Sequence, residues 1–172
     1  MSGAEEQVVL VDAHDNAIGT MGKQEAHARG LLHRAFSVFL FDAQGRVLLQ
    51  RRAWGKYHSS GLWTNACCSH PRPDEAVADA AARRLQEELG IRCPLAEQFR
   101  FTYRADVGNG LIEHELDHVF FGRFDGDPQP DPAEVMDVRW MDPAAISAEL
   151  AASPERFTPW FRICWPEVCG RR

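Results

Sequence analysis

The sequence predicts an α+β protein, because short strand-like segments outnumber a few helical ones. Runs rich in Val, Leu, Ile and Phe alternate with turns rich in Gly and Asp, which is typical of strands joined in hairpins. One longer segment, residues 75–89, instead has apolar residues at helical spacing. The 172 residues are enough for one domain with a full hydrophobic core. We therefore expect residues 1–172 to form a single sandwich of mixed and antiparallel sheets with flanking helices.

The first third of the chain contains a short strand and a predicted hairpin. Residues 8–11 are a β-branched run, and the polar stretch 23–32 predicts a loop or a short helix. Residues 35–41 and 46–50 predict two further strands. The turn 42–45, Asp-Ala-Gln-Gly, would join them in a hairpin.

Residues 75–89 predict the main helix. Asp74 is a candidate N-cap, and Gly90 is a natural residue to end the helix. The spacing of its apolar residues predicts a buried stripe made of Ala78, Ala82, Leu85 and Leu89.

The second half of the chain predicts another hairpin, a strand and two helices. Residues 99–105 and 111–121 would pair through the turn Gly-Asn-Gly at 108–110. Residues 135–141 predict a strand, and residues 143–150 a helix with Pro143 in its first turn. A closing helix follows Pro159, and Pro166 is expected to interrupt it.

Composition excludes several classes of protein. The formal net charge of -6 argues against a nucleic-acid binder, which is usually basic. No apolar run approaches the ~20 residues that a membrane helix needs, and residues 1–10 lack a basic flank and a secretory core. Five cysteines, an odd number, fit a reducing compartment. We therefore expect a cytoplasmic protein, a monomer or weak homodimer, that binds neither nucleic acid nor membrane.

Cys68 lies in the most informative segment of the chain, Trp63 to Pro71. Its thiol is two residues from the imidazole of His70, just before the predicted helix. A thiol beside an imidazole can act as a nucleophile, as a proton donor or acceptor, or as a metal ligand. Residues elsewhere in the chain must decide among these roles.

The predicted helix carries two acid–base pairs at a spacing of four residues, Arg83 with Glu87 and Arg84 with Glu88. Spacing alone favours exposed ion pairs, each stabilising the helix by only ~0.3–0.5 kcal/mol. The nearby Cys68 favours a functional role for Arg84 and Glu88, but not for the other pair.

Histidines and glutamates elsewhere form a candidate metal site. Glu113 and Glu115 share one face of a predicted strand, where a cation between them or exposure to solvent would relieve their repulsion. His27, His33 and His70 are candidate nitrogen ligands, whereas His14, His58 and His118 are interpreted as surface or core residues. Three imidazoles and two carboxylates suit Mn²⁺ or Zn²⁺ better than Mg²⁺ or Ca²⁺.

The helix and its surroundings resemble a known family. Residues 75–91 resemble the Nudix signature. The glycine that opens that pattern would fall at Ser69, and Arg84 stands where the pattern has a metal-binding glutamate. Nearly the whole chain resembles the type I isopentenyl diphosphate isomerases, a branch of the Nudix superfamily. The matching segments are Lys23 with His27, residues 33–37, 50–52, Lys56, and residues 61–71, 83–90, 103–105, 113–115 and 157–160.

The resemblance implies a role for each matching residue. It implies a Mn²⁺ or Zn²⁺ ion held by His27, His33, His70, Glu113 and Glu115, with residues 1–33 as an N-terminal extension that supplies histidine ligands. It also implies that Glu88 holds a Mg²⁺ ion that bridges to the substrate diphosphate. Cys68, Glu115 and Tyr103 would be catalytic, and Cys67 an inert neighbour. The implied substrate-binding residues are Lys23, Arg52, Lys56, Arg84 and Trp160.

The reaction implied by the resemblance interconverts isopentenyl diphosphate and dimethylallyl diphosphate in isoprenoid biosynthesis. Protonation of the alkene would give a tertiary carbocation, and loss of a different proton would move the double bond. One alternative is a Nudix hydrolase of a nucleoside diphosphate derivative, although Arg84 stands where a carboxylate is needed. Another is a metal-dependent binding domain without turnover, in which replacement of Cys68 would leave function intact.

Overall fold

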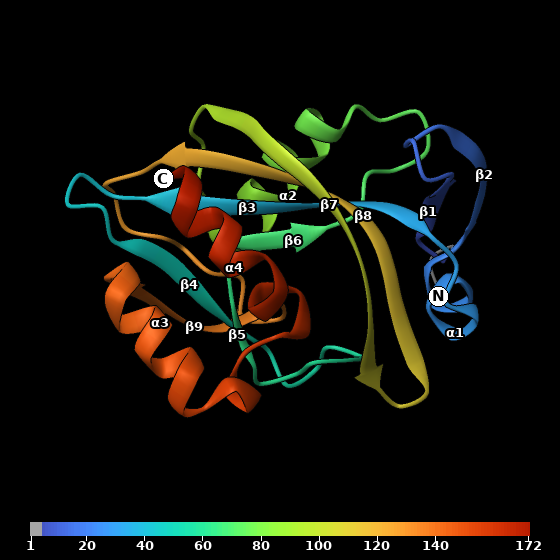
Figure 1. Cartoon of the computed structure of the whole chain (residues 1–172). Helices are drawn as coiled ribbons and strands as arrows, with labels where there is room; N and C mark the ends of the chain where they lie inside the picture. The colour runs from blue at the N-terminus through green and yellow to red at the C-terminus, as the bar shows by residue number, and fades with distance from the viewer. Residues whose placement is uncertain (1–4) are drawn as a thin grey trace.

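A mixed β-sheet with helices on both faces makes up residues 5–172, the part of the chain that the computed structural model describes (Figure 1). The strands are β1 (Gln7–Val11), β2 (Ala17–Gly22), β3 (His33–Phe41), β4 (Val47–Arg52), β5 (Trp63–Thr64), β6 (Cys67–Ser69), β7 (Leu95–Gly108), β8 (Leu111–Arg123) and β9 (Val135–Met141). The helices are α1 (Lys23–Arg29), α2 (Val77–Leu89), α3 (Pro143–Ala152) and α4 (Pro159–Arg171), with a 3₁₀ turn at Pro154–Arg156.

Strand β3 lies at the centre of this sheet. It runs parallel to β8 along its whole length, and antiparallel to β6 on its other edge. The pairs β1–β2, β4–β9 and β7–β8 are also antiparallel. The predicted α+β class with mixed pairing is therefore confirmed, with the strands linked in one sheet.

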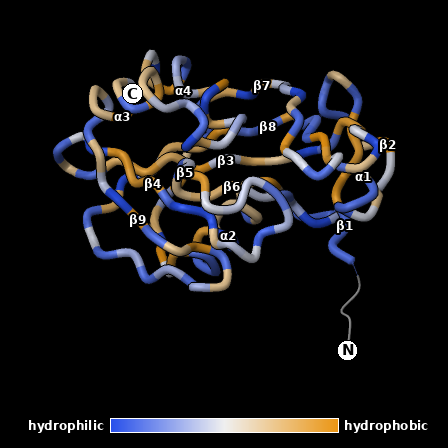
Figure 2. The backbone as a smooth tube through the Cα atoms, turned by 90° about the horizontal axis from the view of Figure 1, so that it is seen from below, coloured by the Kyte–Doolittle hydropathy of each residue, from blue (hydrophilic) through white to orange (hydrophobic). Residues whose placement is uncertain are grey.

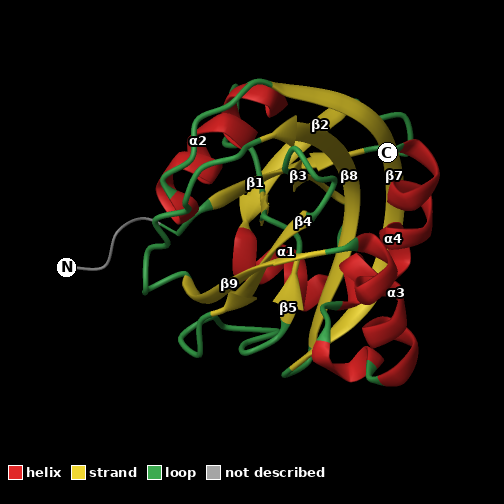
Figure 3. Ribbon diagram, turned by 90° about the vertical axis from the view of Figure 1, so that its left-hand side faces the viewer, coloured by secondary structure: helices red, strands yellow, loops and turns green. Residues whose placement is uncertain are grey.

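Both faces of β3 are buried beneath helices. Phe36, Val38 and Leu40 pack in one cluster with α2, whereas Phe39 packs with Phe161 and other residues of α4 on the opposite face. Figure 3 shows α2 on one side of the sheet and α3 and α4 on the other. Hydrophobic stretches follow β3 and β4 in Figure 2. Each buried phenylalanine stabilises the fold by roughly 1.5–3 kcal/mol, so this central strand is firmly held.

Most elements predicted from the sequence are present. The first strand, the short helix near residue 23, the second hairpin, the strand at 135–141 and the helix at 143–150 correspond to β1, α1, β7–β8, β9 and α3. The strand β2, over Ala17–Gly22, was not predicted. Among residues 5–172, no helix is long and apolar enough to cross a membrane.

The predicted hairpin of residues 35–50 is wrong in its pairing. Both strands exist, but β3 and β4 meet only at Phe41 and Val47. Strand β4 instead pairs with β9 over Val47–Arg52. The reason is that β6 and β8 already occupy the two edges of β3, so β4 diverges from it after the turn.

Three predictions about the helices are also wrong, at least in part. Helix α2 begins at Val77 and Asp74 does not cap it, because Asp74 adopts a left-handed conformation (φ 65°) in the preceding turn. The predicted buried stripe of α2 is right for Leu85 and Leu89 but wrong for Ala78 and Ala82, which are exposed; Ala80 and Ala81 are buried in their place. Helix α4 continues through Pro166, which is exposed, so water can satisfy the carbonyl group that the proline leaves without a donor.

Candidate active site and metal cluster

The register of the central strands brings distant functional residues together. In the parallel pair, His33 of β3 lies opposite Glu115 of β8. On the other edge of β3, Ser37 lies opposite Cys68 of β6. Because side chains alternate along a strand, Glu113, Glu115 and Asp117 point to one face of β8. The predicted shared face of Glu113 and Glu115 is therefore confirmed, and both side chains are buried.

Three imidazoles and a carboxylate converge at the end of β3. One ligand atom from each of His27, His33, His70 and Glu115 lies within 4.8 Å of the others. Oε2 of Glu115 is 2.6 Å from Nε2 of His70 and 2.9 Å from Nε2 of His33. Four of the five predicted ligands of the nitrogen-rich site therefore form one compact cluster.

The orientation of these imidazoles fits a bound cation. Nδ1 of His33 is 2.9 Å from the carbonyl oxygen of Leu31, which can only accept a hydrogen bond, so Nδ1 carries a proton and Nε2 is the nitrogen that faces Glu115. Nε2 of the buried His27 has no hydrogen-bond partner among the described residues. Lone pairs facing a carboxylate repel it unless a proton or metal ion lies between them. A mixed nitrogen and oxygen donor set suits Mn²⁺ or Zn²⁺.

Glu115 is the charged centre of this cluster. Burial would raise the pKa of its carboxyl group, but His70, His27 and His33 outweigh burial and hold that pKa well below its usual range. The carboxylate is therefore ionised and can act as a metal ligand or as a proton acceptor.

The fifth predicted ligand, Glu113, lies in a neighbouring group. Its Oε1 is 2.9 Å from Nε2 of His58 and 4.0 Å from Nε2 of His27, and these three residues form a second possible metal-binding set. The hydroxyl of Tyr103 lies 2.6 Å from Oε2 of Glu113 and also contacts Glu115. Burial and these two carboxylates raise the pKa of Tyr103 well above its usual value, so its hydroxyl keeps its proton.

Cys68 also keeps its proton. Burial first, and then the nearby carboxyl group of Asp117, raise the pKa of the Cys68 thiol to about 12. Its Sγ is 3.0 Å from Oδ1 of Asn65, which can accept from the thiol, and 3.0 Å from Nε1 of Trp160, which can donate to it. The side chain is thus a neutral thiol in a fixed orientation. Cys67 is fully buried in the core beneath α2, consistent with an inert neighbour.

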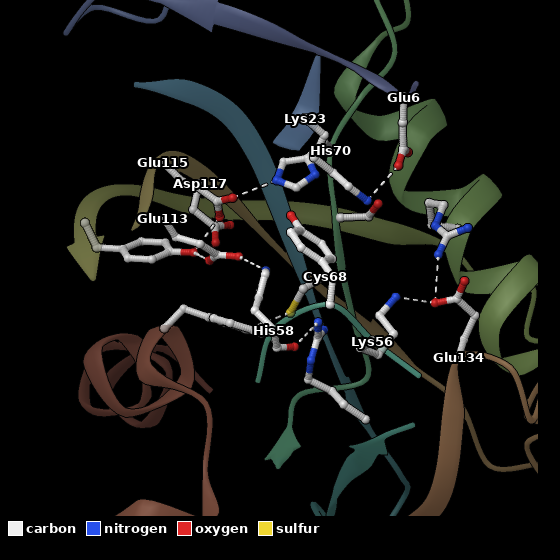
Figure 4. A pocket seen from close by; sticks show the side chains of 16 residues that line it. Glu6, Lys23, Lys56, His58, Cys68, His70, Glu113, Glu115, Asp117 and Glu134 are labelled. Carbon is white, nitrogen blue, oxygen red and sulfur yellow. Dashed lines mark hydrogen bonds and ion pairs between the residues drawn. The ribbon is translucent and has the colours of Figure 1, made fainter. Parts of the chain in front are cut away.

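A cavity of about 110 Å³ joins the thiol, the carboxylates and a set of cations. Figure 4 shows Glu113, Glu115 and Asp117 on one side of it, Lys23 and Lys56 on the other, and Cys68 between them. All the substrate-binding residues predicted from the sequence line this cavity: Lys23, Arg52, Lys56, Arg84 and Trp160. Carboxylates at the rim neutralise part of this charge, because Glu6 pairs with Lys23 at 2.8 Å and Glu134 pairs with Lys56.

The two acid–base pairs of α2 differ in their surroundings. Arg83 bonds Glu75 at 2.8 Å and Glu87 at 3.2 Å, and none of these three residues lines the cavity. Glu88 is only 4% exposed, and it accepts hydrogen bonds from Arg84 at 2.7 Å and from Gln50 at 3.0 Å. Burial would lower the pKa of Arg84, but Glu88 outweighs it and the pKa is raised, so the guanidinium stays charged. Arg84 also bonds Glu87 at 2.7 Å, so the two pairs share a contact, and of these four residues only Arg84 lines the cavity.

Several residues that the sequence did not single out belong to the site. Asp117 lines the cavity and accepts a hydrogen bond of 2.8 Å from Ser37. Asp117 continues the two-residue spacing of Glu113 and Glu115, so this spacing could have predicted that it shares their face. His58 lies against Glu113 rather than in a purely structural environment. Nothing in the sequence distinguishes this single histidine in a polar loop.

The other two histidines follow their predicted roles. His14 is exposed, and His118 is buried, where it contacts Asp15 at 2.9 Å and Glu97 at 2.6 Å on the far face of β8.

Comparisons with solved structures identify the fold. A protein from Deinococcus radiodurans, DR0079, superimposes with a TM-score of 0.77 at 18% identity, covering 94% of this chain and 98% of that one. A MutT protein from Methanosarcina mazei superimposes with a TM-score of 0.66 at 18% identity, covering 81% and 94%. The NUDIX domain model matches residues 31–161.

Sequence comparisons identify the family. Isopentenyl-diphosphate Delta-isomerase 2 of Aromatoleum aromaticum is 54% identical over 168 residues, which cover 98% of this chain and 89% of that protein. The isopentenyl-diphosphate Delta-isomerase of Serratia proteamaculans is 54% identical over 157 residues, covering 91% and 88%. The resemblance predicted from the motifs is confirmed, and this chain belongs to the isopentenyl-diphosphate Delta-isomerase family, within the NUDIX fold.

Proposed function

We propose that this protein interconverts isopentenyl diphosphate and dimethylallyl diphosphate, by protonation and deprotonation through a tertiary carbocation. The observation that carries the proposal is that a neutral thiol and an ionised carboxylate line one cavity together with four cationic side chains. Family membership supports the same reaction and its place in isoprenoid biosynthesis.

One group holds a proton and another can accept one, as this reaction requires. Moving a double bond needs an acid on one side of the substrate and a base on the other. Cys68 keeps a proton on Sγ, and the Asn65 and Trp160 contacts orient it. Glu115 offers an ionised carboxylate, with the Tyr103 hydroxyl beside it. These three residues are therefore the catalytic groups in our proposal.

The metal ligands have separate tasks. His27, His33, His70 and Glu115, with Glu113 beside them, would hold Mn²⁺ or Zn²⁺, whose positive charge would set the proton affinity of the Glu115 carboxyl group. Glu88 offers carboxylate oxygens, the donors that Mg²⁺ prefers. Its Oε2 accepts a hydrogen bond from Arg84, so Mg²⁺ binding there would require Arg84 to turn toward the substrate diphosphate.

The cationic side chains would anchor the diphosphate group. Four cationic side chains line the cavity: Lys23, Arg52, Lys56 and Arg84. Three of them already pair with carboxylates, Lys23 with Glu6, and Lys56 and Arg84 with Glu134. The diphosphate would exchange with these carboxylates, and this exchange would enlarge a cavity that is now small. Anchoring the non-reacting end of a substrate positions the reacting carbon atoms.

Trp160 is the residue proposed to cover the isoprenoid tail and the developing carbocation. The Arg52 guanidinium lies 5.2 Å from the centre of its ring, which is the kind of contact that a carbocation would make. A desolvated cation–π contact contributes ~2 kcal/mol. The ring is only 3% exposed, so it also helps to keep out water that would trap the cation.

We further propose that residues 1–172 act as one isomerase domain, with residues 1–33 as the extension that supplies His27 and His33. Residues 1–4 of that extension lie outside the described part of the chain. A monomer or weak homodimer remains our prediction for the oligomeric state.

A proton-exchange assay tests the function. The protein is incubated with isopentenyl diphosphate, Mg²⁺ and Mn²⁺ in deuterated water. We expect deuterium to enter dimethylallyl diphosphate without loss of diphosphate. Release of phosphate from a nucleoside diphosphate derivative, without isomerisation, would instead identify the hydrolase alternative. If neither reaction occurs, the result would favour the metal-dependent binding domain without turnover.

A further inference from the structure

The loop between β4 and β5, residues 53–62, directs two side chains into the metal cluster. Its base is closed by backbone hydrogen bonds between Arg52 and Leu62 at 2.9 Å and between Gly61 and Arg52 at 2.9 Å. Tyr57 and His58 lie within this loop, and His58 is only 5% exposed. Figure 4 shows His58 beside Glu113. Neither residue has a role in the reaction derived above.

His58 holds one oxygen of Glu113. Its Nε2 is 2.9 Å from Oε1 of Glu113, and its Nδ1 is 3.2 Å from the hydroxyl of Ser59. A carboxylate can only accept a hydrogen bond, so Nε2 donates to Glu113. The other oxygen of Glu113 contacts the Tyr103 hydroxyl at 2.6 Å. Both oxygens of this carboxylate are therefore oriented by a hydrogen-bond donor.

Tyr57 holds the other side of His27. Its hydroxyl is hydrogen-bonded to Nδ1 of His27, whereas Nε2 of that ring is buried and has no partner among residues 5–172. A metal-binding imidazole usually donates from its second nitrogen to a hydrogen-bond acceptor, a place that the Tyr57 oxygen can fill here, and this contact fixes both the tautomer and the orientation of the ring. Donation from Nδ1 to the tyrosine oxygen leaves the lone pair of Nε2 directed into the cluster.

Contacts outside the cluster hold these two side chains in place. The backbone carbonyl of His58 accepts a hydrogen bond of 3.2 Å from Arg52, and its ring packs edge-on against Trp160 at 6.0 Å. Nζ of Lys23 lies 5.2 Å from the centre of the Tyr57 ring. Plain core packing would explain the burial of His58, but it would not require polar contacts aimed at two different metal ligands.

We propose that Tyr57 and His58 are positioning residues that orient His27 and Glu113 for metal binding. This inference rests on the metal cluster of the proposed function. It assigns neither residue as a metal ligand or as a catalytic group. Removal of such outer partners typically lowers metal affinity 10–100-fold, because the ligands lose their fixed orientation.

Titration of the full chain with Mn²⁺ alone, followed by calorimetry, tests this inference. We expect His58→Ala and Tyr57→Phe each to weaken Mn²⁺ binding by about 10-fold or more. His58→Gln should recover most of the affinity, because its amide can donate to Glu113 from the place of Nε2. The matched control is His14→Ala, which removes an exposed histidine that belongs to neither metal-binding group, and this variant should bind as the unmodified protein does. Thermal melting verifies that each variant is folded.

Three outcomes would overturn the inference. The first is an affinity of His58→Ala within twofold of the unmodified protein. The second is a folded His58→Gln variant that binds no better than His58→Ala. The third is a stoichiometry of two ions that falls to one in His58→Ala, which would make His58 a ligand. Because no substrate is present, these results are independent of whether the protein isomerises isopentenyl diphosphate.

Discussion

Single side chains in the cavity owe their protonation to their immediate neighbours. Cys68 keeps its proton because it is desolvated and lies near a carboxyl group, whereas Glu115 loses its proton because imidazoles surround it. The same burial that favours a neutral thiol is overcome at Glu115 by three partners. One protonated and one ionised group at neutral pH are what a proton transfer across a substrate requires.

Removal of either group should abolish isomerisation without unfolding the protein. We expect Cys68→Ala and Glu115→Gln each to lower kcat by at least ~10²-fold, the usual contribution of a proton-transfer group. Steady-state kinetics with isopentenyl diphosphate measures the loss, and circular dichroism verifies the fold. Cys93→Ala is the matched control, since Cys93 is a half-buried thiol that does not line the cavity. An active Cys68→Ala enzyme would reject the catalytic role of the thiol.

At the scale of elements, the end of α2 fixes the position of Glu88. Gly90 ends this helix in a left-handed conformation with φ 64°, and its N–H bonds the carbonyl of Gln86. The segment that follows β8 returns here, where backbone groups of Gln129 and Asp131 donate to the carbonyls of Leu89 and Glu88. A change at Gly90 therefore disturbs both the helix end and the loop packed on it.

We expect Gly90→Ala to destabilise the protein by more than the ~1–2 kcal/mol that a left-handed conformation alone costs a residue with a Cβ. The added Cβ would lie 3.1 Å from Cβ of Gln129, so crowding adds to the backbone strain. Gly45→Ala is the matched control, because Gly45 also has a positive φ (78°) but no atom within 4 Å of the added carbon. Urea denaturation gives both free energies of unfolding, and equal losses would show that crowding at Gly90 is unimportant.

For the whole molecule, the sequence predicted local patterns better than long-range pairing. The two-residue period correctly placed Glu113 and Glu115 on one face, and the helical spacing correctly placed Leu85 and Leu89 in the core. The parallel register that sets His33 opposite Glu115 joins residues 82 positions apart, and no local pattern encodes it. The family motifs supplied that information instead.

The errors have related causes. The pairing of β4 with β9 depends on which edges of β3 remain free, and this is a property of the complete sheet. His58 is a lone histidine in a loop, and only its contact with Glu113 reveals a possible role. Pro166 is tolerated in α4 because it faces outward, and that face depends on how the helix packs. In each case, tertiary structure decided between local alternatives.

The central claim is that the sheet as a whole brings distant residues together into one metal-binding cluster. Anomalous X-ray diffraction from crystals grown with Mn²⁺ tests this claim most directly. The account predicts a peak at the manganese edge bonded to His27, His33, His70 and Glu115, within the cavity that contains the Cys68 thiol. A Mn²⁺ ion bound elsewhere, with these four side chains making no contact to it, would contradict the account.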